Sequence, residues 1–140
     1  MHHHHRTVEE LMTSDVLTVR EGDPIAKALH VMSTAVIHHL PVVDERHHLV
    51  GLISDRDLLR ALAGDKNRTD PVGAVMQRAV KTVKVKTHAH TAARVMIDLG
   101  IHSLPVERED GTLVGMVTAN DFLAVAETAL RGIDVSKETL

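Results

Sequence analysis

Apolar residues in the first half of the chain recur with the spacing of an amphipathic helix. Ile25, Ala28 and Met32 lie at positions i, i+3 and i+7, which predicts one apolar stripe on a helix that ends near Ala35. The preceding Asp23-Pro24 pair predicts the start of this helix, with aspartate as the N-cap and proline at the first helical position.

Short segments rich in β-branched residues lie on either side of this helix. They predict strands at residues 16–19, 40–43 and 48–53. Pro41 has no N–H to donate, so the second of these strands is expected to have the proline at its start or to lie at a sheet edge. The polar segment 44–47 predicts a hairpin loop between the second and third strands.

Two further helices complete the first half. Residues 8–12 have apolar spacings of three and four and predict a short lead-in helix. A longer helix is expected to open at Ser54, to run through Leu62 and to be closed by Gly64. The first half therefore reads strand–helix–strand–strand–helix after its lead-in.

The second half repeats the first. The segment from Gly51 to Asp57 returns 64 positions later, from Gly115 to Asp121, and similar residues match at the same shift on both sides of it. The repeat predicts, in order, a lead-in helix at 72–76 after Asp70-Pro71, a strand at 80–85, a helix at 88–99, a strand at 104–107, a turn at Asp110-Gly111, a strand at 112–117 and a helix at 119–130.

These patterns predict an α/β (α+β) fold of two tandem β-α-β-β-α repeats, packed as a pseudo-two-fold pair. A single repeat of about 60 residues would bury too little surface to be stable by itself, so the two are expected to pack together. Gly132 is expected to stop the last helix. The expected organisation is a tag or disordered start at 1–7 that contains the run His2-His3-His4-His5, repeat 1 at 8–64, a linker at 65–70, repeat 2 at 71–130 and a polar tail at 131–140.

Composition excludes several classes of function. The net charge of −3 argues against nucleic-acid binding, and with Phe122 as the only aromatic residue the chain cannot stack bases on aromatic platforms. No apolar run approaches the roughly 18 residues of a membrane span. The absence of cysteine excludes disulfides and thiolate metal sites and fits a cytoplasmic protein.

The repeated motif offers a candidate binding site in each half. Ser54 with Asp57, and Thr118 with Asp121, have the spacing of a capping box, which satisfies free N–H groups in the first turn of a helix. The same geometry suits a ligand, because a helix start favours a phosphate and a carboxylate can accept two hydrogen bonds from a ribose diol.

Together, the repeat, the Ile-His-x-Leu-Pro-Val sequence before the second strand of each unit, and the Gly-h-h-Ser/Thr-x-x-Asp sequence before its last helix (h, an apolar residue) resemble the CBS domain. Two such domains in tandem resemble a CBS pair, or Bateman module. The resemblance covers about residues 8–128 and implies a small stand-alone regulatory protein. It would bind AMP, ADP, ATP or S-adenosylmethionine in clefts between the repeats, require no cofactor, form a homodimer through its helices and act on a regulated partner protein.

The resemblance also implies roles for particular residues. Two groups near ribose and phosphate are expected, one in each site: Ser54, Arg56 and Asp57, and Thr118, Asn120 and Asp121. Four residues before the second strands are expected near the phosphate: His38, His39, His102 and Ser103. Val16 and Val80 are expected to offer backbone groups to the adenine edge, although core packing explains them equally well.

One departure from the family pattern concerns charge. Members that bind charged nucleotides often have arginine where this chain has His39 and Ser103, so phosphate affinity is expected to be weaker, most of all beside Ser103. Arg56 would compensate in its own site, and His39 would supply charge at lower pH. We therefore expect two unequal sites, with the Arg56 and His39 side favouring the more highly charged ligand.

Other interpretations were weighed on the same residues. Neighbouring histidines at 47–48 and at 88–90 invite a zinc site, but histidines so close in sequence rarely converge on one ion and no carboxylate pattern supports them. No nucleophile–base pair or phosphate loop points to an enzyme. The alternative to a ligand sensor is a ligand-independent dimerisation scaffold, in which both Ser/Thr-x-x-Asp motifs act only as helix caps.

Overall fold

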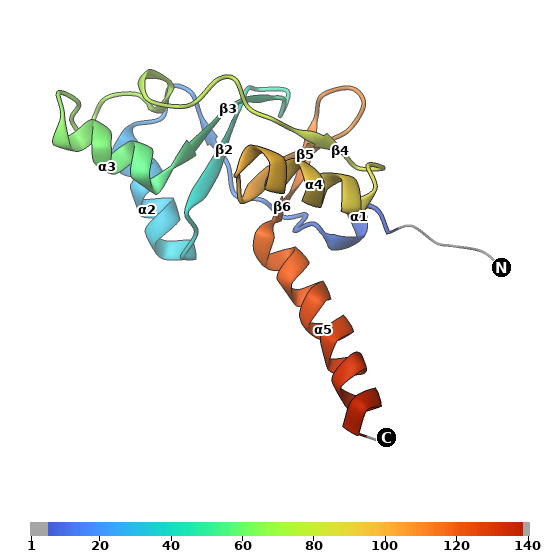
Figure 1. The fold of residues 1–140 in the computed structure, drawn as a ribbon. Coiled ribbons are helices and arrows are strands. Elements are labelled where there is room, and N and C mark those ends of the chain that lie inside the picture. Colours follow the sequence, from blue (N-terminus) through green and yellow to red (C-terminus); the bar gives the residue numbers. More distant parts are fainter. Residues whose placement is uncertain (1–5, 139–140) are drawn as a thin grey trace.

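The computed structural model describes the backbone of residues 6–138 and the side chains of residues 6–133, and it contains two three-stranded sheets flanked by helices (Figure 1). The first repeat contains β1 (Val19–Arg20), α2 (Ile25–Ala35), β2 (His39–Val43), β3 (Leu49–Ser54) and α3 (Asp55–Ala63). The second contains β4 (Val83–Lys84), α4 (Ala89–Leu99), β5 (Ser103–Glu107), β6 (Leu113–Thr118) and α5 (Ala119–Glu138). The predicted fold class is confirmed.

The two sheets have the same topology and register. In each, the first strand pairs in parallel with the second, and the second pairs antiparallel with the third. Val42 lies opposite Gly51 in the first sheet, and Val106 lies opposite Gly115 in the second. Both hairpins have an irregularity directly after this pair, so the internal repeat extends to the detail of strand pairing.

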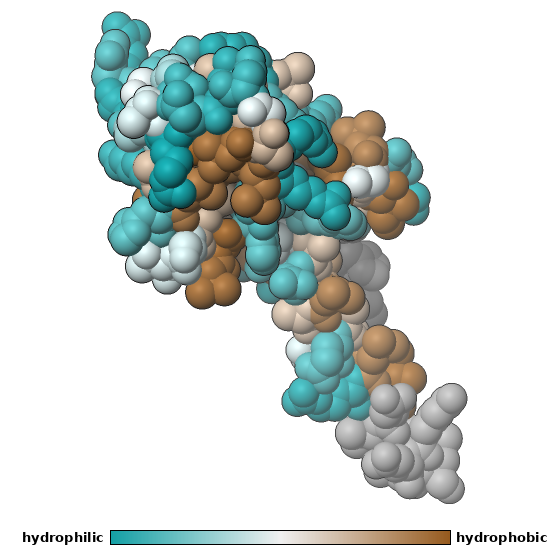
Figure 2. Space-filling model, turned by 90° about the vertical axis from the view of Figure 1, so that its left-hand side faces the viewer, coloured by the Kyte–Doolittle hydropathy of each residue, from teal (hydrophilic) through white to brown (hydrophobic). Residues whose placement is uncertain are grey.

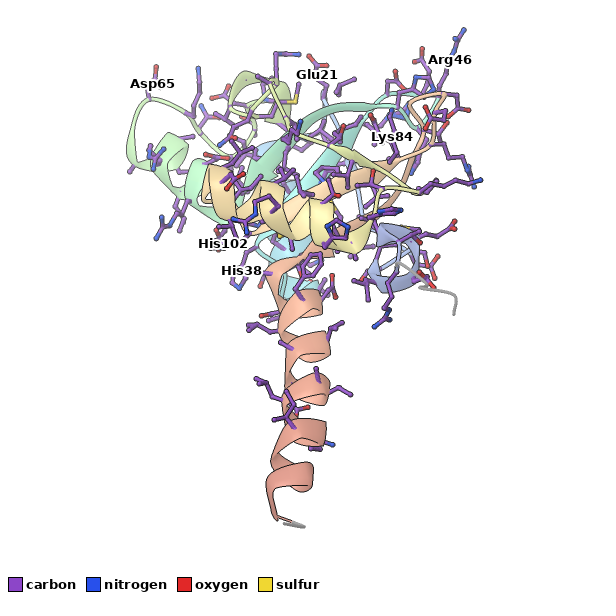
Figure 3. All side chains as sticks on the ribbon, turned by 45° about the vertical axis from the view of Figure 1, so that its right-hand side comes forward. Glu21, His38, Arg46, Asp65, Lys84 and His102 are labelled. Carbon is purple, nitrogen blue, oxygen red and sulfur yellow. The ribbon has the colours of Figure 1, made fainter. Side chains whose placement is uncertain are left out.

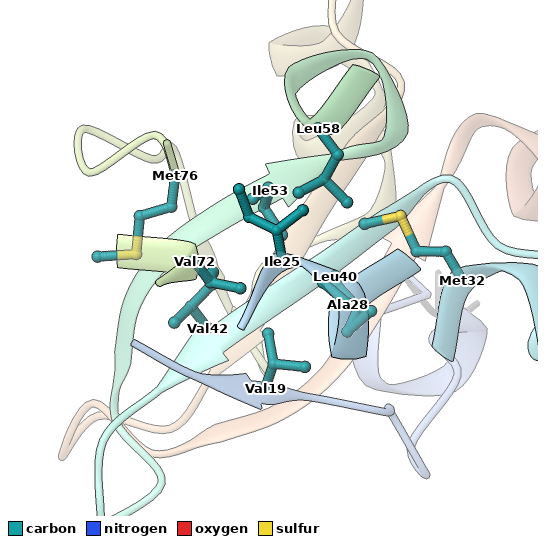
Figure 4. Close-up of a cluster of buried hydrophobic side chains, with 10 residues drawn as sticks. All are labelled: Val19, Ile25, Ala28, Met32, Leu40, Val42, Ile53, Leu58, Val72 and Met76. Carbon is teal, nitrogen blue, oxygen red and sulfur yellow. The ribbon is translucent and has the colours of Figure 1, made fainter. Parts of the chain in front are cut away.

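The hydrophobic core of each repeat is completed by the N-terminal lead-in segment of the other repeat. The predicted stripe of α2 is buried in the first core together with Val72 and Met76, which follow the linker (Figure 4). Val72 belongs to η1 (Val72–Ala74), a 3₁₀ helix where the sequence predicted an α-helical lead-in. The second core contains Val8 from α1 (Val8–Leu11), and both Val8 and Val72 are fully buried.

Backbone hydrogen bonds fasten the exchanged lead-in segments. The N–H of Leu52 donates to the carbonyl of Gln77 at 2.9 Å, and the reciprocal bond is also 2.9 Å long. Thr13 and Met116 exchange the equivalent pair of bonds in the other half, at 2.9 and 3.0 Å. The two repeats are therefore joined through their sheets as well as through side-chain packing.

Several sequence-based expectations about element ends were wrong, and one is the strand expected at 80–85, which spans only Val83–Lys84. The N-cap of α2 is Pro24, because the Asp23 carboxylate instead accepts a hydrogen bond from the N–H of Arg20 at 2.8 Å. The predicted strand at residues 16–19 begins only at Val19, and its first residues instead border a cleft. Gly132 does not stop the last helix, which continues to Glu138, since a glycine inside a helix costs only about 1 kcal/mol.

The last helix projects from the body of the molecule (Figure 1). The predicted loose tail at 131–140 is therefore wrong for its helical part, up to residue 138. The run of histidines at positions 2–5 lies outside the described residues. No helix between residues 6 and 138 is long and apolar enough to cross a membrane.

Gly51 and Gly115 allow the exchanged segments to approach the sheets. A Cβ atom on Gly115 would lie 2.5 Å from the Sδ of Met12 and 2.8 Å from the carbonyl oxygen of Thr13. On Gly51 it would lie 2.6 Å from the Sδ of Met76. A side chain at either position would push the lead-in segment away from the core that it covers.

We expect Gly115→Ala to lower the free energy of unfolding by about 1–3 kcal/mol, because the added methyl group overpacks this contact. Urea denaturation followed by circular dichroism measures the loss. Gly22→Ala is the matched control, since no atom lies within 4 Å of its added Cβ, and a change within roughly 0.5 kcal/mol is expected. Equal midpoints for Gly115→Ala and the parent protein would contradict the proposed tight contact.

Candidate functional site

Two clefts lie where the repeats meet. The first, of about 390 Å³, is lined by Ser54 and Asp57 from repeat 1 and by Val80 and His102 from repeat 2. The second, of about 580 Å³, combines residues from both repeats in the equivalent way: Thr118, Asn120, Val16, Ile37 and His38. Both volumes fall within the range of about 300–1,000 Å³ that is typical of small-molecule sites.

The first cleft contains a carboxylate held in a fixed position. Strand β3 runs directly into α3, and Asp57 Oδ2 accepts a hydrogen bond from the N–H of Ser54 at 3.0 Å. The Asp57 N–H donates in turn to Ser54 Oγ at 3.1 Å, which completes the predicted capping box. Asp57 Oδ1 has no hydrogen-bond partner among residues 6–133, so it is available to a ligand hydroxyl group.

The second motif shares one of these hydrogen bonds and borders a different part of the surface. Asp121 Oδ2 accepts hydrogen bonds from the N–H of Thr118 at 2.7 Å and from its Oγ1 at 3.2 Å. Thr118 and Asn120 line the second cleft, but Asp121 borders a shallow groove between α1 and α5, beside Arg6 and Glu10. The structure therefore brings only one of the two predicted ribose-binding carboxylates to a cleft wall.

The predicted histidines gather at one end of the sheets, where His38 and His102 lie near the start of α5 (Figure 3). His38 Nδ1 lies 2.8 Å from Asp55 Oδ2, and this hydrogen bond lowers the pKa of the Asp55 carboxyl group. His39, His102 and Ser103 line both clefts, so the same residues form the wall between them.

His39 is half-buried, and its pKa is lowered from 6.5 chiefly because burial disfavours the charged imidazolium. The nearby Asp55 and Asp57 carboxylates oppose this effect, and the other two histidines add to it. A phosphate placed against His39 would favour the protonated form, because an opposite charge stabilises it.

Sequence reasoning included two residues that line neither cleft, Asp121 and Arg56, and missed several that do, two of them charged. Arg56 lines neither cleft. Lys81 lines the first cleft and Asp15 the second, although neither was predicted. The sequence does mark both residues, because each is charged where the other repeat has an apolar residue. A shift of 64 positions matches Lys81 with Leu17 and Asp15 with Ala79.

Metal-ligating side chains do not converge in the described part of the chain. Within it, no group of three or more histidine, cysteine, aspartate or glutamate residues could hold an ion. The rings of His88 and His90 lie 5.5 Å apart between centroids, in a tilted contact.

Comparison with known proteins identifies the class. The chain belongs to the CBS domain family, which it matches twice, over residues 8–64 and 72–127. It is 32% identical over 123 residues to homoserine O-acetyltransferase of Methanohalobium evestigatum and 37% identical over 122 residues to the magnesium transporter MgtE of Thermus thermophilus. These matches cover 88% and 84% of the chain, which spans only 24% and 26% of the relatives' lengths.

Solved structures share the fold of the whole pair. CBSX2 in complex with AMP superposes with a TM-score of 0.80 at 27% identity, over 89% of this chain and 98% of that one. The CBS pair of protein MJ0100, in complex with 5′-methylthioadenosine and S-adenosyl-L-methionine, gives 0.81 at 26% identity, over 90% and 99%. The cytosolic domain of MgtE in complex with ATP gives 0.76 at 34% identity, over 86% and 48%.

The lowered pKa of His39 predicts a dependence of stability on pH. Between its lowered pKa and about 6.5 the unfolded chain binds more protons than the folded one, so the free energy of unfolding falls as the pH drops through this window. We expect a smaller fall in His39→Gln, measured by urea denaturation at several pH values without ligand. His30→Gln, at an exposed histidine on α2, is the control. The same pH dependence in both variants would contradict the assignment to His39.

Proposed function

We propose that this protein is a regulatory module that binds adenosine compounds in the clefts between its two CBS repeats and modulates a partner protein. The observation that carries the proposal is the first cleft, where the Ser54–Asp57 cap of one repeat faces Val80 and Lys81 of the other. The family membership and the AMP, ATP and S-adenosyl-L-methionine complexes of similar structures support the same ligand class.

A ligand in the first cleft would be held by groups from both repeats. The free oxygen of Asp57 would accept a hydrogen bond from a ribose hydroxyl group, and the ammonium group of Lys81 would lie beside a phosphate. With no phenylalanine, tyrosine or tryptophan among the residues lining either cleft, aliphatic side chains and backbone at Val80 and Ile101 would enclose the base. In the second cleft, Val16 and Ile37 would have the corresponding role.

The regulatory effect would follow from this bridging. A ligand that touches both repeats changes their relative arrangement only as far as it binds one arrangement more tightly than another. The signal would then be read by a partner whose contact depends on that arrangement. We propose no reaction and no required cofactor for the module. We also propose that it acts in the cytoplasm, because its sequence contains no cysteine.

We further propose that two copies associate through their helices. Large apolar side chains are exposed on three helices: Leu59 on α3, Ile97 and Leu99 on α4, and Leu123, Leu130 and Ile133 on α5. Figure 2 shows apolar residues, in brown, on the body and again along the projecting helix. Single exposed apolar side chains are common on protein surfaces, whereas a group of them on neighbouring helices favours a contact with another protein chain.

The alternative is a scaffold that dimerises without a ligand, with both Ser/Thr-x-x-Asp motifs acting only as caps. The capping box of Ser54 with Asp57 and the hydrogen bond from the Thr118 N–H to Asp121 are compatible with this function. The position of Asp57 at a cleft favours the sensor, because a purely structural cap does not require its carboxylate to line a cavity.

Ligand binding is expected to raise the melting temperature. A ligand at about 100 times its dissociation constant adds about 2.7 kcal/mol, which for a body of this size is roughly 5–10 °C. Differential scanning fluorimetry with AMP, ADP, ATP and S-adenosylmethionine measures the shift, after any nucleotide retained during purification has been removed. The absence of a shift with all four would favour the scaffold.

The two equivalent aspartates provide matched variants for the same assay. Asp57→Ala and Asp121→Ala each remove a helix cap, so both are expected to lower stability by about 0.5–2 kcal/mol without ligand. Only Asp57→Ala also removes a carboxylate from a cleft wall, so only this variant is expected to lose the AMP-dependent shift. If Asp57→Ala kept the full AMP-dependent shift in melting temperature, the proposed ribose contact would be wrong.

Self-association is expected to be strong enough to measure in dilute solution. Sedimentation velocity at micromolar concentration should give the mass of two chains, and Leu130→Glu should move the equilibrium toward one chain, because it places a charge on the exposed apolar face of α5. Leu17→Glu, at an apolar side chain that is half exposed but lies at the second cleft, is the control. A single-chain mass for the parent protein would contradict the dimer.

A further inference from the structure

The two clefts differ in charge at two pairs of positions that the repeat makes equivalent. Lys81 lines the first cleft, and its counterpart Leu17 lines the second. Asp15 lines the second cleft, and its counterpart Ala79 lines the first. At these two pairs, moving from the first cleft to the second removes one positive charge and adds one negative charge. The Asp57 carboxylate lines only the first cleft and offsets one of these two charges.

Lys81 is free to meet an anionic ligand. Its side chain is exposed and has no ion pair or hydrogen bond among residues 6–133. It is the only lysine or arginine among the residues that line the first cleft, and the residues that line the second include neither type. The Lys84 ammonium nearby in sequence is already engaged, 3.1 Å from Glu107 Oε1.

Two of the three histidines act on both sites, because His39 and His102 line both clefts. His38 lines only the second cleft, where its Nδ1 lies 2.8 Å from Asp55 Oδ2. Arg56, which sequence reasoning offered as the source of unequal phosphate affinity, lines neither cleft. Among equivalent positions that line both clefts, the fixed charge differs at 81 with 17 and at 15 with 79.

We propose that the first cleft selects a 5′-phosphorylated adenosine, and that the second selects an adenosine compound whose 5′ substituent is uncharged or cationic. The proposal rests on the proposed function, since it assigns a ligand class to each adenosine site. Lys81 and Asp57 supply the first cleft with a phosphate partner and a ribose partner. In the second, Asp15 repels a phosphate, Leu17 offers an apolar contact, and Asp121 lies outside the cleft.

The size of the effect follows from the exposure of the charged groups. Lys81 and Asp15 both lie at the surface, where water weakens their interaction with a ligand. A single charge pair about 4 Å apart in water changes affinity by roughly fivefold. Each substitution is thus expected to change the ratio of AMP affinity to adenosine affinity by about this factor in its own cleft, and to leave adenosine binding unchanged.

The test exchanges the two side chains. Lys81→Leu, Leu17→Lys and the double variant are titrated with AMP and with adenosine, which differ only by the phosphate, at pH 8, above the ordinary range of histidine titration, and at low salt. Methyl NMR separates the sites, because Leu52 lines the first cleft and its counterpart Met116 lines the second. Lys86→Leu, at an exposed lysine outside both clefts, controls for net charge.

In the parent protein, AMP should bind the first cleft about five times more tightly than adenosine does, as followed at Leu52, and should show no such preference at Met116. Lys81→Leu should remove the preference, Leu17→Lys should create one in the second cleft, and Lys86→Leu should change neither. The proposal is overturned if Lys81→Leu binds AMP as Lys86→Leu does, or if AMP is equally preferred at both reporters in the parent protein. Failure of both ligands to move either reporter would instead overturn the proposed function itself.

Discussion

The exchange of lead-in segments is the contact on which the rest of the molecule depends. Val8 is buried in the core of the second repeat, and Val72 in the core of the first. A repeat that lost this contact would expose apolar surface and the backbone groups that now pair at Leu52 and Met116. Neither half is complete by itself, which is consistent with the marginal stability expected of units of about 60 residues.

The candidate sites follow from this exchange. After each buried lead-in residue the chain continues between the two repeats. Residues 13 and 15–17 line one cleft, and residues 77 and 79–81 line the other. Each cleft thus combines the first residues of a helix in one repeat with the lead-in of the other. A ligand in either site would bridge the two halves, which is the arrangement that a sensor of relative position requires.

Pseudo-symmetry makes the differences between the halves informative. Strand register, the hydrogen bond from the Ser54 or Thr118 N–H to an aspartate, and the close approach of a methionine to a glycine recur in both repeats, so they belong to the shared fold. The charges at positions 15 and 81 do not recur, and Asp57 and Asp121 lie differently although both accept this hydrogen bond. In the proposed ligand assignment, the features that break the repeat while lining a cleft are the ones that set ligand choice at each site.

The sequence by itself determined the fold class, the repeat and both capping motifs, because hydrophobic periodicity and first-turn hydrogen bonds are local. Tertiary structure decided which lead-in covers which core, and with it that Lys81 joins Ser54 and Asp57 while Arg56 and Asp121 lie elsewhere. Contacts between residues so far apart in the sequence leave no periodic signal. Only packing brings them together, and periodicity along the chain carries no information about that packing.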